Sequence, residues 1–195
     1  NNFKFAGTNF TNSLLIGHST TGTLSTAIQN VGVGTTALDA ITQGDGNTAI
    51  GYNSGTAITT SSYNTLVGSH SGYNLAAGGE YNVGLGLNAG YYNATGDGNT
   101  AVGAQSMQGA SGQNNSSNTA LGNLSLSAIT TGGFNLALGK SSGDNITSGS
   151  GNVVIGKADV SSATADDQLS ISDGEDGSVV WMTGDSSANI TFAAT

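Results

Sequence analysis

The sequence contains no cysteine, no proline and no arginine, and only three lysines among its 195 residues. Without cysteine there is neither a disulfide framework nor a thiolate metal site, and the redox compartment stays open. Twelve acidic residues give a net charge of −9. The chain therefore lacks the cationic side chains that contact nucleic-acid phosphates or anionic membrane surfaces, and neither is an expected partner.

Long hydrophobic runs and a high charge content are missing as well. No stretch of 18 apolar residues occurs, so we expect no membrane insertion. Charged residues make up 8% of the chain, unlike the charge-rich and proline-rich composition of disordered proteins. The first residue is Asn1 and no signal-peptide pattern follows, so we expect a fragment, a processed product or the ordered part of a longer chain.

What the sequence has in abundance is glycine, with 32 residues, and much of it recurs in one motif. The glycine after a short apolar pair, as in NTAIGYNS at 47–54, marks each copy and is called the anchor here. Successive anchors are 17, 17, 17, 18, 17, 19, 17 and 17 residues apart. They are Gly17, Gly34, Gly51, Gly68, Gly86, Gly103, Gly122, Gly139 and Gly156. Such regular spacing predicts a repeat protein.

Each copy has the same internal order of residue types. A bulky aliphatic residue directly precedes the anchor, and a small residue usually precedes that, as in Ala49 and Ile50. Four residues before the anchor stands an asparagine, or Ser13 in the first copy: Asn30, Asn47, Asn64, Asn82, Asn99, Asn118, Asn135 and Asn152. Seven or eight residues after the anchor is a second apolar position: Leu24, Ile41, Ile58, Leu75, Ala94, Ala110, Ile129, Ile146 and Ala163.

This repeat predicts an all-β fold, a parallel β-solenoid (β-roll) of about nine 17-residue coils over residues 12–160. A coil of this length fits two short strands joined by two turns, and neighbouring coils stack at about 4.8 Å. Glycine permits the turn at each anchor because it reaches positive φ without steric cost. The stacked asparagines are expected to form an amide ladder along the rod.

Side chains alternate across a strand, which divides the repeat between two faces. The bulky column before the anchor lies on one face, and the small Ala or Gly column lies on the other. One face can fill the coil interior, and the other needs a partner surface. Small side chains favour a close backbone approach, so we expect chains to associate along the rod through the small column.

The motif N-x-x-[IVL]-G-x-x-[SA], as in NTAIGYNS, NTLVGSHS, NVGLGLNA and NTAVGAQS, resembles the head repeats of trimeric autotransporter adhesins. Similar repeats occur in bacteriophage tail fibres, especially cyanophage-like ones, and the two ends of the chain look more like that group. The resemblance covers roughly residues 12–160. It implies a left-handed parallel β-roll with three chains around one axis, although adhesin heads typically use shorter coils.

The resemblance also implies a function in attachment. We expect a structural segment of a homotrimeric phage tail fibre, located in the virion, that spaces or presents a host-receptor-binding tip. Its partners are then further copies of itself, adjoining fibre modules and a host cell-surface glycan or protein. One alternative is the head of a bacterial trimeric adhesin at the bacterial cell surface, and another is a polysaccharide-degrading tail spike. An ice-binding solenoid is disfavoured because its regular Thr-x-Thr array is missing.

Both ends are expected to depart from the repeat. Residues 1–11 are interpreted as an N-terminal strand and connection. Residues 161–195 are interpreted as a C-terminal cap or transition segment, in which LSIS, VVWMT and NITFA form short strands and Trp181 is a buried anchor. Terminal units of a solenoid must differ from the repeat, because an exposed end coil would template aggregation.

All six tyrosines fall between residues 52 and 92, and four of them align in columns on adjacent coils. Tyr63 and Tyr81 precede their anchors by five residues, whereas Tyr73 and Tyr91 follow theirs by five. Stacked aromatic rings can grip a sugar ring, so these four are candidate receptor-binding or glycan-binding residues. The alternative interpretation is an aromatic ladder that covers the coil corners.

We expect no catalytic residues, no metal, no cofactor and no enzymatic activity. Asp45 and Asp97 lie in matching GDGN turns, with Glu80 in the same column, and turn formation explains them better than calcium binding. His18 and His70 occupy different columns, so they do not form a metal pair. No pair of carboxylates for glycoside hydrolysis lies on one strand face of the repeats.

Overall fold

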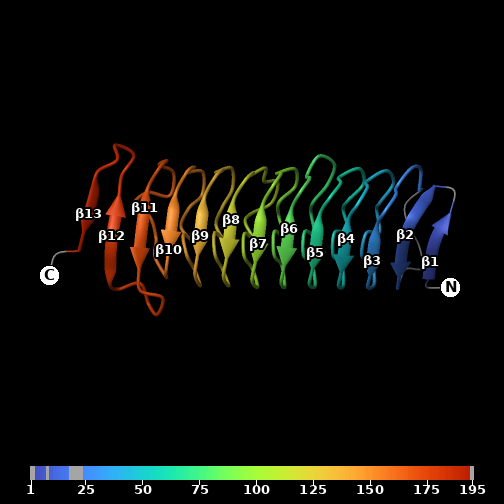
Figure 1. Cartoon of the computed structure of the whole chain (residues 1–195), viewed down its shortest axis with the longest axis horizontal. Helices are drawn as coiled ribbons and strands as arrows, with labels where there is room; N and C mark the ends of the chain where they lie inside the picture. The colour runs from blue at the N-terminus through green and yellow to red at the C-terminus, as the bar shows by residue number, and fades with distance from the viewer. Residues whose placement is uncertain (1–2, 8, 18–23, 194–195) are drawn as a thin grey trace.

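The computed structural model describes residues 3–7, 9–17 and 24–193, and this part of the chain contains strands and turns but no helix. Thirteen short strands follow one another in sequence order along the long axis of the molecule (Figure 1). They are β1 (Phe3–Gly7), β2 (Phe10–Ile16), β3 (Val31–Val33), β4 (Thr48–Ile50), β5 (Thr65–Val67), β6 (Val83–Leu85), β7 (Thr100–Val102), β8 (Thr119–Leu121), β9 (Leu136–Leu138), β10 (Val153–Ile155), β11 (Leu169–Ser172), β12 (Val180–Gly184) and β13 (Ile190–Phe192).

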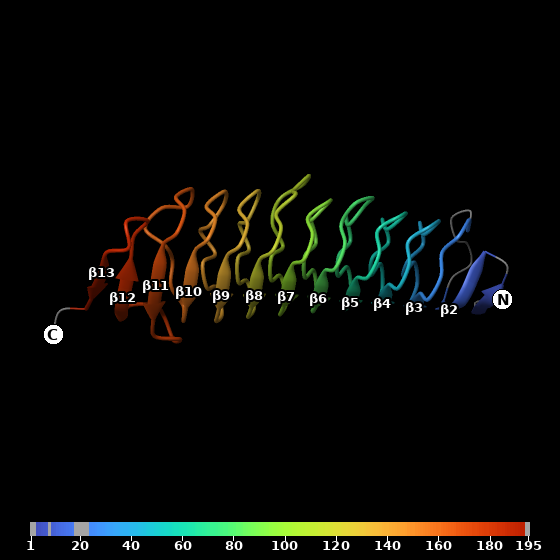
Figure 2. The ribbon, with the colours of Figure 1, turned by 45° about the horizontal axis from the view of Figure 1, so that its top comes forward.

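Strands β2 to β11 pair in parallel, each with the equivalent strand of the next coil. Ala49 pairs with Leu66, for example, 17 residues later in the chain. Figure 2 shows the same coils stacked side by side from the N-terminus to the C-terminus. The prediction of an all-β, parallel β-solenoid of about nine turns is confirmed.

The two ends of the sheet are antiparallel. Strand β1 pairs antiparallel with β2, and β11, β12 and β13 form an antiparallel meander. The parallel stacking continues one strand past the last anchor, because Val153 of β10 pairs with Leu169 of β11. Gln168 precedes this strand and takes the place of the ladder asparagine.

Each coil has one strand, of three residues from β3 to β10, so the prediction of two strands per coil was wrong. After each anchor from Gly34 to Gly139, the residues two and four positions later have positive φ, as at Asn53 (55°) and Gly55 (56°). Alternating left-handed residues curl the chain and prevent an extended strand. The backbone still bonds to the next coil, as in Gly55 N to Ser71 O at 2.9 Å.

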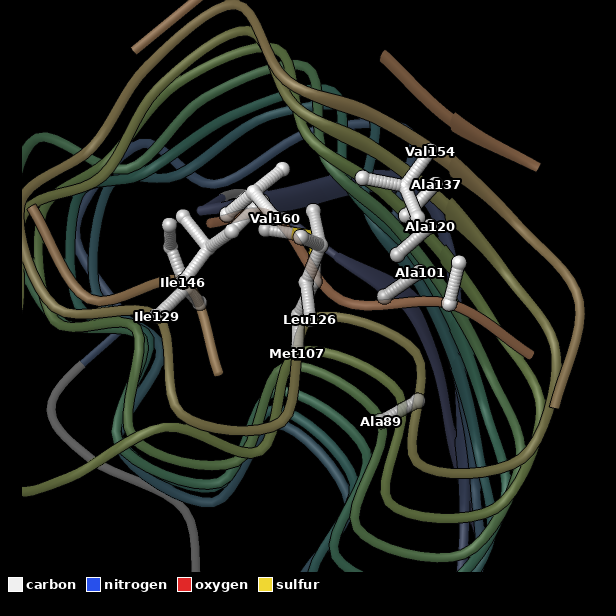
Figure 3. Close-up of a cluster of buried hydrophobic side chains, with 11 residues drawn as sticks. Ala89, Ala101, Met107, Ala120, Leu126, Ile129, Ala137, Ile146, Val154 and Val160 are labelled. Carbon is white, nitrogen blue, oxygen red and sulfur yellow. The ribbon is translucent and has the colours of Figure 1, made fainter. Parts of the chain in front are cut away.

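The face assigned to the small column was also wrong, because these residues point into the coil interior. Ala49, Ala120 and Ala137 are fully buried at the centres of their strands. Figure 3 shows Ala120 and Ala137 on one wall of the interior, facing Ile129 and Ile146. The interior is narrow: a Cβ added at Gly84 would lie 2.5 Å from Ser71 Oγ. Small residues are therefore needed opposite the large ones.

The bulky column consequently lies on the outer face of the sheet. Ile50 is 40% exposed and Leu121 is 46% exposed, although each belongs to a strand whose central residue is buried. This outer aliphatic column comprises Ile16, Val33, Ile50, Val67, Leu85, Val102, Leu121, Leu138, Ile155 and Ile171.

The predicted amide ladder is confirmed and runs inside the rod. At a typical step, Asn64 Oδ1 accepts hydrogen bonds from Asn82 N at 2.9 Å and Asn82 Nδ2 at 3.1 Å. Asn82 Nδ2 also donates to Gly96 O within the coil interior at 2.9 Å. Ser13 begins the ladder by accepting from Asn30 N at 2.8 Å. The ladder therefore satisfies buried backbone groups that no strand could satisfy.

The anchor glycines are required by two separate constraints. Their φ values lie between 97° at Gly17 and 145° at Gly122, in the region that favours glycine. In addition, the anchors of adjacent coils lie directly against each other. A Cβ added at Gly51 would lie 2.5 Å from Gly68 O.

The apolar core is interrupted near the middle of the rod. One buried cluster ends at Leu75 and the next begins at Ala89. Between them lies a cavity of about 20 Å³ bordered by Gly84 and Asn93, which has room for one water molecule. Among the described residues, the buried Gln113 Nε2 has no hydrogen-bond partner.

The second apolar column was therefore predicted correctly only in part. Ile41, Ile58, Leu75, Ile129 and Ile146 are buried as expected. Ala94 and Ala163 are only half-buried and Ala110 is exposed. In these coils the interior is filled instead by Asn93, Gln113 and Val160.

Candidate functional site

The four candidate tyrosines form two stacked pairs. Tyr63 and Tyr81 precede β5 and β6, and their rings are 5.3 Å apart with an interplanar angle of 13°. Tyr73 and Tyr91 follow the same two strands, and their rings are 4.9 Å apart at 9°. The predicted alignment in columns is thus confirmed, and each pair joins the coils anchored at Gly68 and Gly86.

The first pair projects into solvent. Tyr63 is 52% exposed and Tyr81 is 60% exposed. Both residues have positive φ, 61° and 57°, at a position that Gly46 and Gly98 occupy in the flanking coils. This conformation costs a residue other than glycine roughly 1–2 kcal/mol, a cost that stacking offsets only in part.

The second pair is half-buried and belongs to a larger aromatic cluster, in which Tyr52 is 53% exposed. His70 lies between the two pair members and Tyr52, with ring centroids 5.4 Å from Tyr73 and 5.1 Å from Tyr52. Tyr92 packs edge-on against Tyr91 at 4.6 Å. Burial raises the pKa of Tyr91, and the nearby Tyr73 and Tyr92 raise it further. The ring contacts of this cluster join adjacent coils, as the aromatic-ladder interpretation describes.

His70, Tyr52 and Tyr92 were not among the binding residues predicted from the sequence. Their signal was present in the spacing, since they follow their anchors by two, one and six residues on consecutive coils. These positions lie on one side of the coil. A comparison of equivalent repeat positions does not bring these residues together, because each follows its anchor by a different number of residues.

The acidic turn residues serve the backbone. Asp45 Oδ1 accepts a hydrogen bond from Ile28 N at 2.8 Å, and Asp97 Oδ1 accepts one from Glu80 N at 2.7 Å. Each carboxylate thereby holds a turn of the preceding coil. No group of three or more His, Asp or Glu side chains suited to a metal ion occurs within the described residues, and His18 lies outside them.

One pair of carboxylates does come together, on adjacent coils. Partial burial raises the pKa of Asp159, and the neighbouring Asp144 raises it further. Both residues lie outside the strands, Asp144 in a turn and Asp159 in an irregular segment. This contact arises from the stacking of coils, which brings together residues 15 positions apart.

The loop between β11 and β12 is organised by a single carboxylate. Asp173 accepts hydrogen bonds from the N–H groups of Val179, Gly177, Asp176 and Glu175, at 2.7–3.1 Å. These bonds favour the charged form and lower the pKa of Asp173 to about 2.

We expect this loop to loosen in acid. Because the folded-state pKa of Asp173 is below its ordinary value of 3.8, its stabilisation is complete above pH 3.8 and is lost as the pH falls towards about 2. Amide hydrogen exchange at Val179 should accelerate over this range beyond its ordinary pH dependence. In Asp173→Asn, which does not ionise, that additional acceleration should disappear. An identical pH profile in the variant would contradict the assignment.

Trp181 does not form the buried anchor that the sequence predicted, since it is 53% exposed. Strand β12 pairs with β11 and β13 at its edges, but among the described residues no second layer covers β12 and β13 as in the coils. Val179, Ile190 and Phe192 are exposed on the same meander.

Comparison with protein-family models, with curated proteins and with solved structures gives no match. Within the described residues, no helix is long and apolar enough to cross a membrane. The candidate site is therefore assigned from geometry alone, and Tyr63–Tyr81 is the more exposed of its two stacked pairs.

Proposed function

We propose that this chain is a structural segment of a homotrimeric phage tail fibre, a virion component that spaces or presents a host-binding tip. The observation that carries the proposal is the outer aliphatic column. It extends along the whole parallel stack from β2 to β11, and the residues two positions earlier in each strand are also uncharged. A surface of this kind is unusual on a monomeric protein and typical of an interface.

A second copy of the same chain fits this surface. Parallel copies present side chains at the same axial spacing, so the column of one copy meets that of another in register along the full stack. Since all ten members are aliphatic, the shared face would contain no charge, and the net charge of −9 would stay on the outer surfaces. Three such faces meeting at one axis would enclose a dry core.

The exposed apolar residues of β12 and β13 extend this proposal to the C-terminal end. Trp181, Ile190 and Phe192 would be covered by neighbouring copies or by an adjoining fibre module. In this arrangement the meander serves as the cap or transition segment of the solenoid.

The molar mass of the purified chain tests the proposal. Light scattering on a sizing column should give roughly 57 kDa, three times the 19.1 kDa of one chain. The double variant Leu121→Glu with Leu138→Glu should lower the mass towards that of one chain, because it buries charges at the interface.

A matched control is the double variant Thr131→Glu with Ser148→Glu, at exposed positions of adjacent coils outside the strands. It adds the same two charges but should leave the mass unchanged. A folded monomer in the unmodified chain would overturn the proposal, as would equal dissociation in the control.

A further inference from the structure

We propose that the outward ring face of Tyr81 binds a neutral sugar ring, with Glu80 and Asp97 accepting hydrogen bonds from its hydroxyl groups. This inference rests on the proposed attachment function and names the ligand class that the segment would contact. It selects one of the two tyrosine pairs and excludes the other.

The stacked Tyr63–Tyr81 ring pair has one outer face that is covered and one that is open. The Tyr63 ring lies against Gly46, where an added Cβ would be 2.8 Å from Tyr63 Cδ1. Tyr81 covers the opposite face of Tyr63. On the far side of Tyr81 comes Gly98, and a Cβ added there would meet only Ser117 Oγ, at 3.9 Å. One face of the Tyr81 ring is therefore open, because Gly98, the residue on that side, has no side chain.

The ring is rigidly presented. Tyr63 supports Tyr81 from behind, and Tyr63 N donates to Asp45 O at 2.8 Å, which fixes the corner of its coil. An aromatic platform that is already ordered loses little conformational entropy when a ligand stacks on it.

The polar groups beside the ring determine the ligand class. Asp97 Oδ1 accepts a hydrogen bond from the backbone N of Glu80 at 2.7 Å, so the Asp97 carboxylate lies beside the residue that directly precedes Tyr81. In the proposed complex, the free Asp97 Oδ2 and the Glu80 carboxylate accept hydroxyl hydrogens of the sugar. The three lysines are far away in sequence and coil number, at Lys4, Lys140 and Lys157. This acidic surrounding favours neutral sugars and repels anionic ones such as sialylated glycans.

The half-buried Tyr73–Tyr91 pair lacks these properties. Its rings are half-buried, with His70 packed at a tilt against both and Tyr92 packed edge-on against Tyr91. Removal of this pair should lower stability without removing a binding face.

Phe134 provides a matched control. It occupies the same column as Tyr81, has a similar positive φ of 58°, and is 75% exposed. Gly133 and Ser150 take the positions that Glu80 and Asp97 have beside Tyr81, so Phe134 lacks both of these carboxylates. Asp167 lies one coil further on, with its carboxylate against Gly151.

Saturation-transfer NMR on the full chain tests the site with soluble neutral oligosaccharides of glucose, galactose and mannose and one sialylated oligosaccharide. At least one neutral oligosaccharide should bind more tightly than the sialylated one. Tyr81→Ala should weaken this binding by at least about tenfold, whereas Phe134→Ala should change it by less than about twofold. In Gly98→Asn, asparagine tolerates the positive φ, but its side chain fills the space beside the open face of Tyr81. This variant should weaken binding as Tyr81→Ala does.

Three results would overturn the inference: no binding by any neutral sugar, preference for the sialylated one, or equal losses in Tyr81→Ala and Phe134→Ala. Thermal unfolding of each variant shows whether the loss follows from misfolding, and Tyr81→Phe should retain binding as an independent folded control. The mass of the same samples separates the two proposals, since a trimer that binds no sugar refutes only this site.

Discussion

Gly51→Ala is expected to lower the free energy of unfolding by about 3–5 kcal/mol, from backbone strain and steric overlap together. At a φ of 134° any side chain is strained, and the new Cβ would lie 2.5 Å from the carbonyl oxygen of Gly68. That oxygen belongs to the next coil, so relief requires the coils to separate. Urea denaturation followed by circular dichroism measures the change.

Two further glycines separate the contributions. At Gly90 the φ is 61° but nothing lies within 4 Å of an added Cβ, so Gly90→Ala should cost only about 1 kcal/mol. Gly174 has neither constraint, and Gly174→Ala should be nearly neutral. Equal losses at all three positions would show that close approach of the anchors does not govern stacking.

Asn135→Ala should be comparably destabilising, by about 3–5 kcal/mol, because it leaves several buried groups without partners. Asn135 Oδ1 accepts from Asn152 N at 3.0 Å and Asn152 Nδ2 at 2.9 Å, and its own amide donates to Gly149 O at 2.9 Å. No water replaces these bonds readily inside a coil this narrow. Chemical denaturation provides the measurement.

Asn123→Ala is the matched control, since Asn123 is half-buried and its side chain makes one hydrogen bond, to Ala104 O at 2.7 Å. It should cost about 1 kcal/mol. If the two variants lost equal stability, the ladder would contribute no more than an ordinary surface asparagine.

Much of the fold could be predicted because a solenoid converts sequence spacing directly into distance. Asn64 and Asn82 bond because they occupy the same position in consecutive coils, and the extra residue between them bulges from a turn. The anchor and ladder positions could therefore be predicted without knowing the cross-section of the coil.

The direction of each face could not be obtained in this way. Alternation shows that Ala49 and Ile50 lie on opposite faces, but it does not identify the inner one. That choice depends on the opposite wall, where left-handed residues such as Leu124 and Leu126 bring the chain close. Leucine carries no sequence signal for positive φ, so the single strand per coil and the narrow interior were both missed.

The candidate site was predictable to the same degree. Equal spacing from the anchor glycines paired Tyr63 with Tyr81 and Tyr73 with Tyr91. This spacing could not show which pair lies at an exposed corner of the coil and which lies on a half-buried side. Trp181 was assigned to a core by residue type, whereas burial requires a second layer that β12 and β13 lack within the described chain.

The interruption of the core between Leu75 and Ala89 has a mechanical consequence. In a solenoid each coil contacts only its neighbours, so strength along the axis is set by the weakest interface. Here that interface has a cavity inside, and the two tyrosine stacks bridge it from outside. A rod pulled from its ends would therefore extend in two steps, yielding first at its middle while each half stays intact.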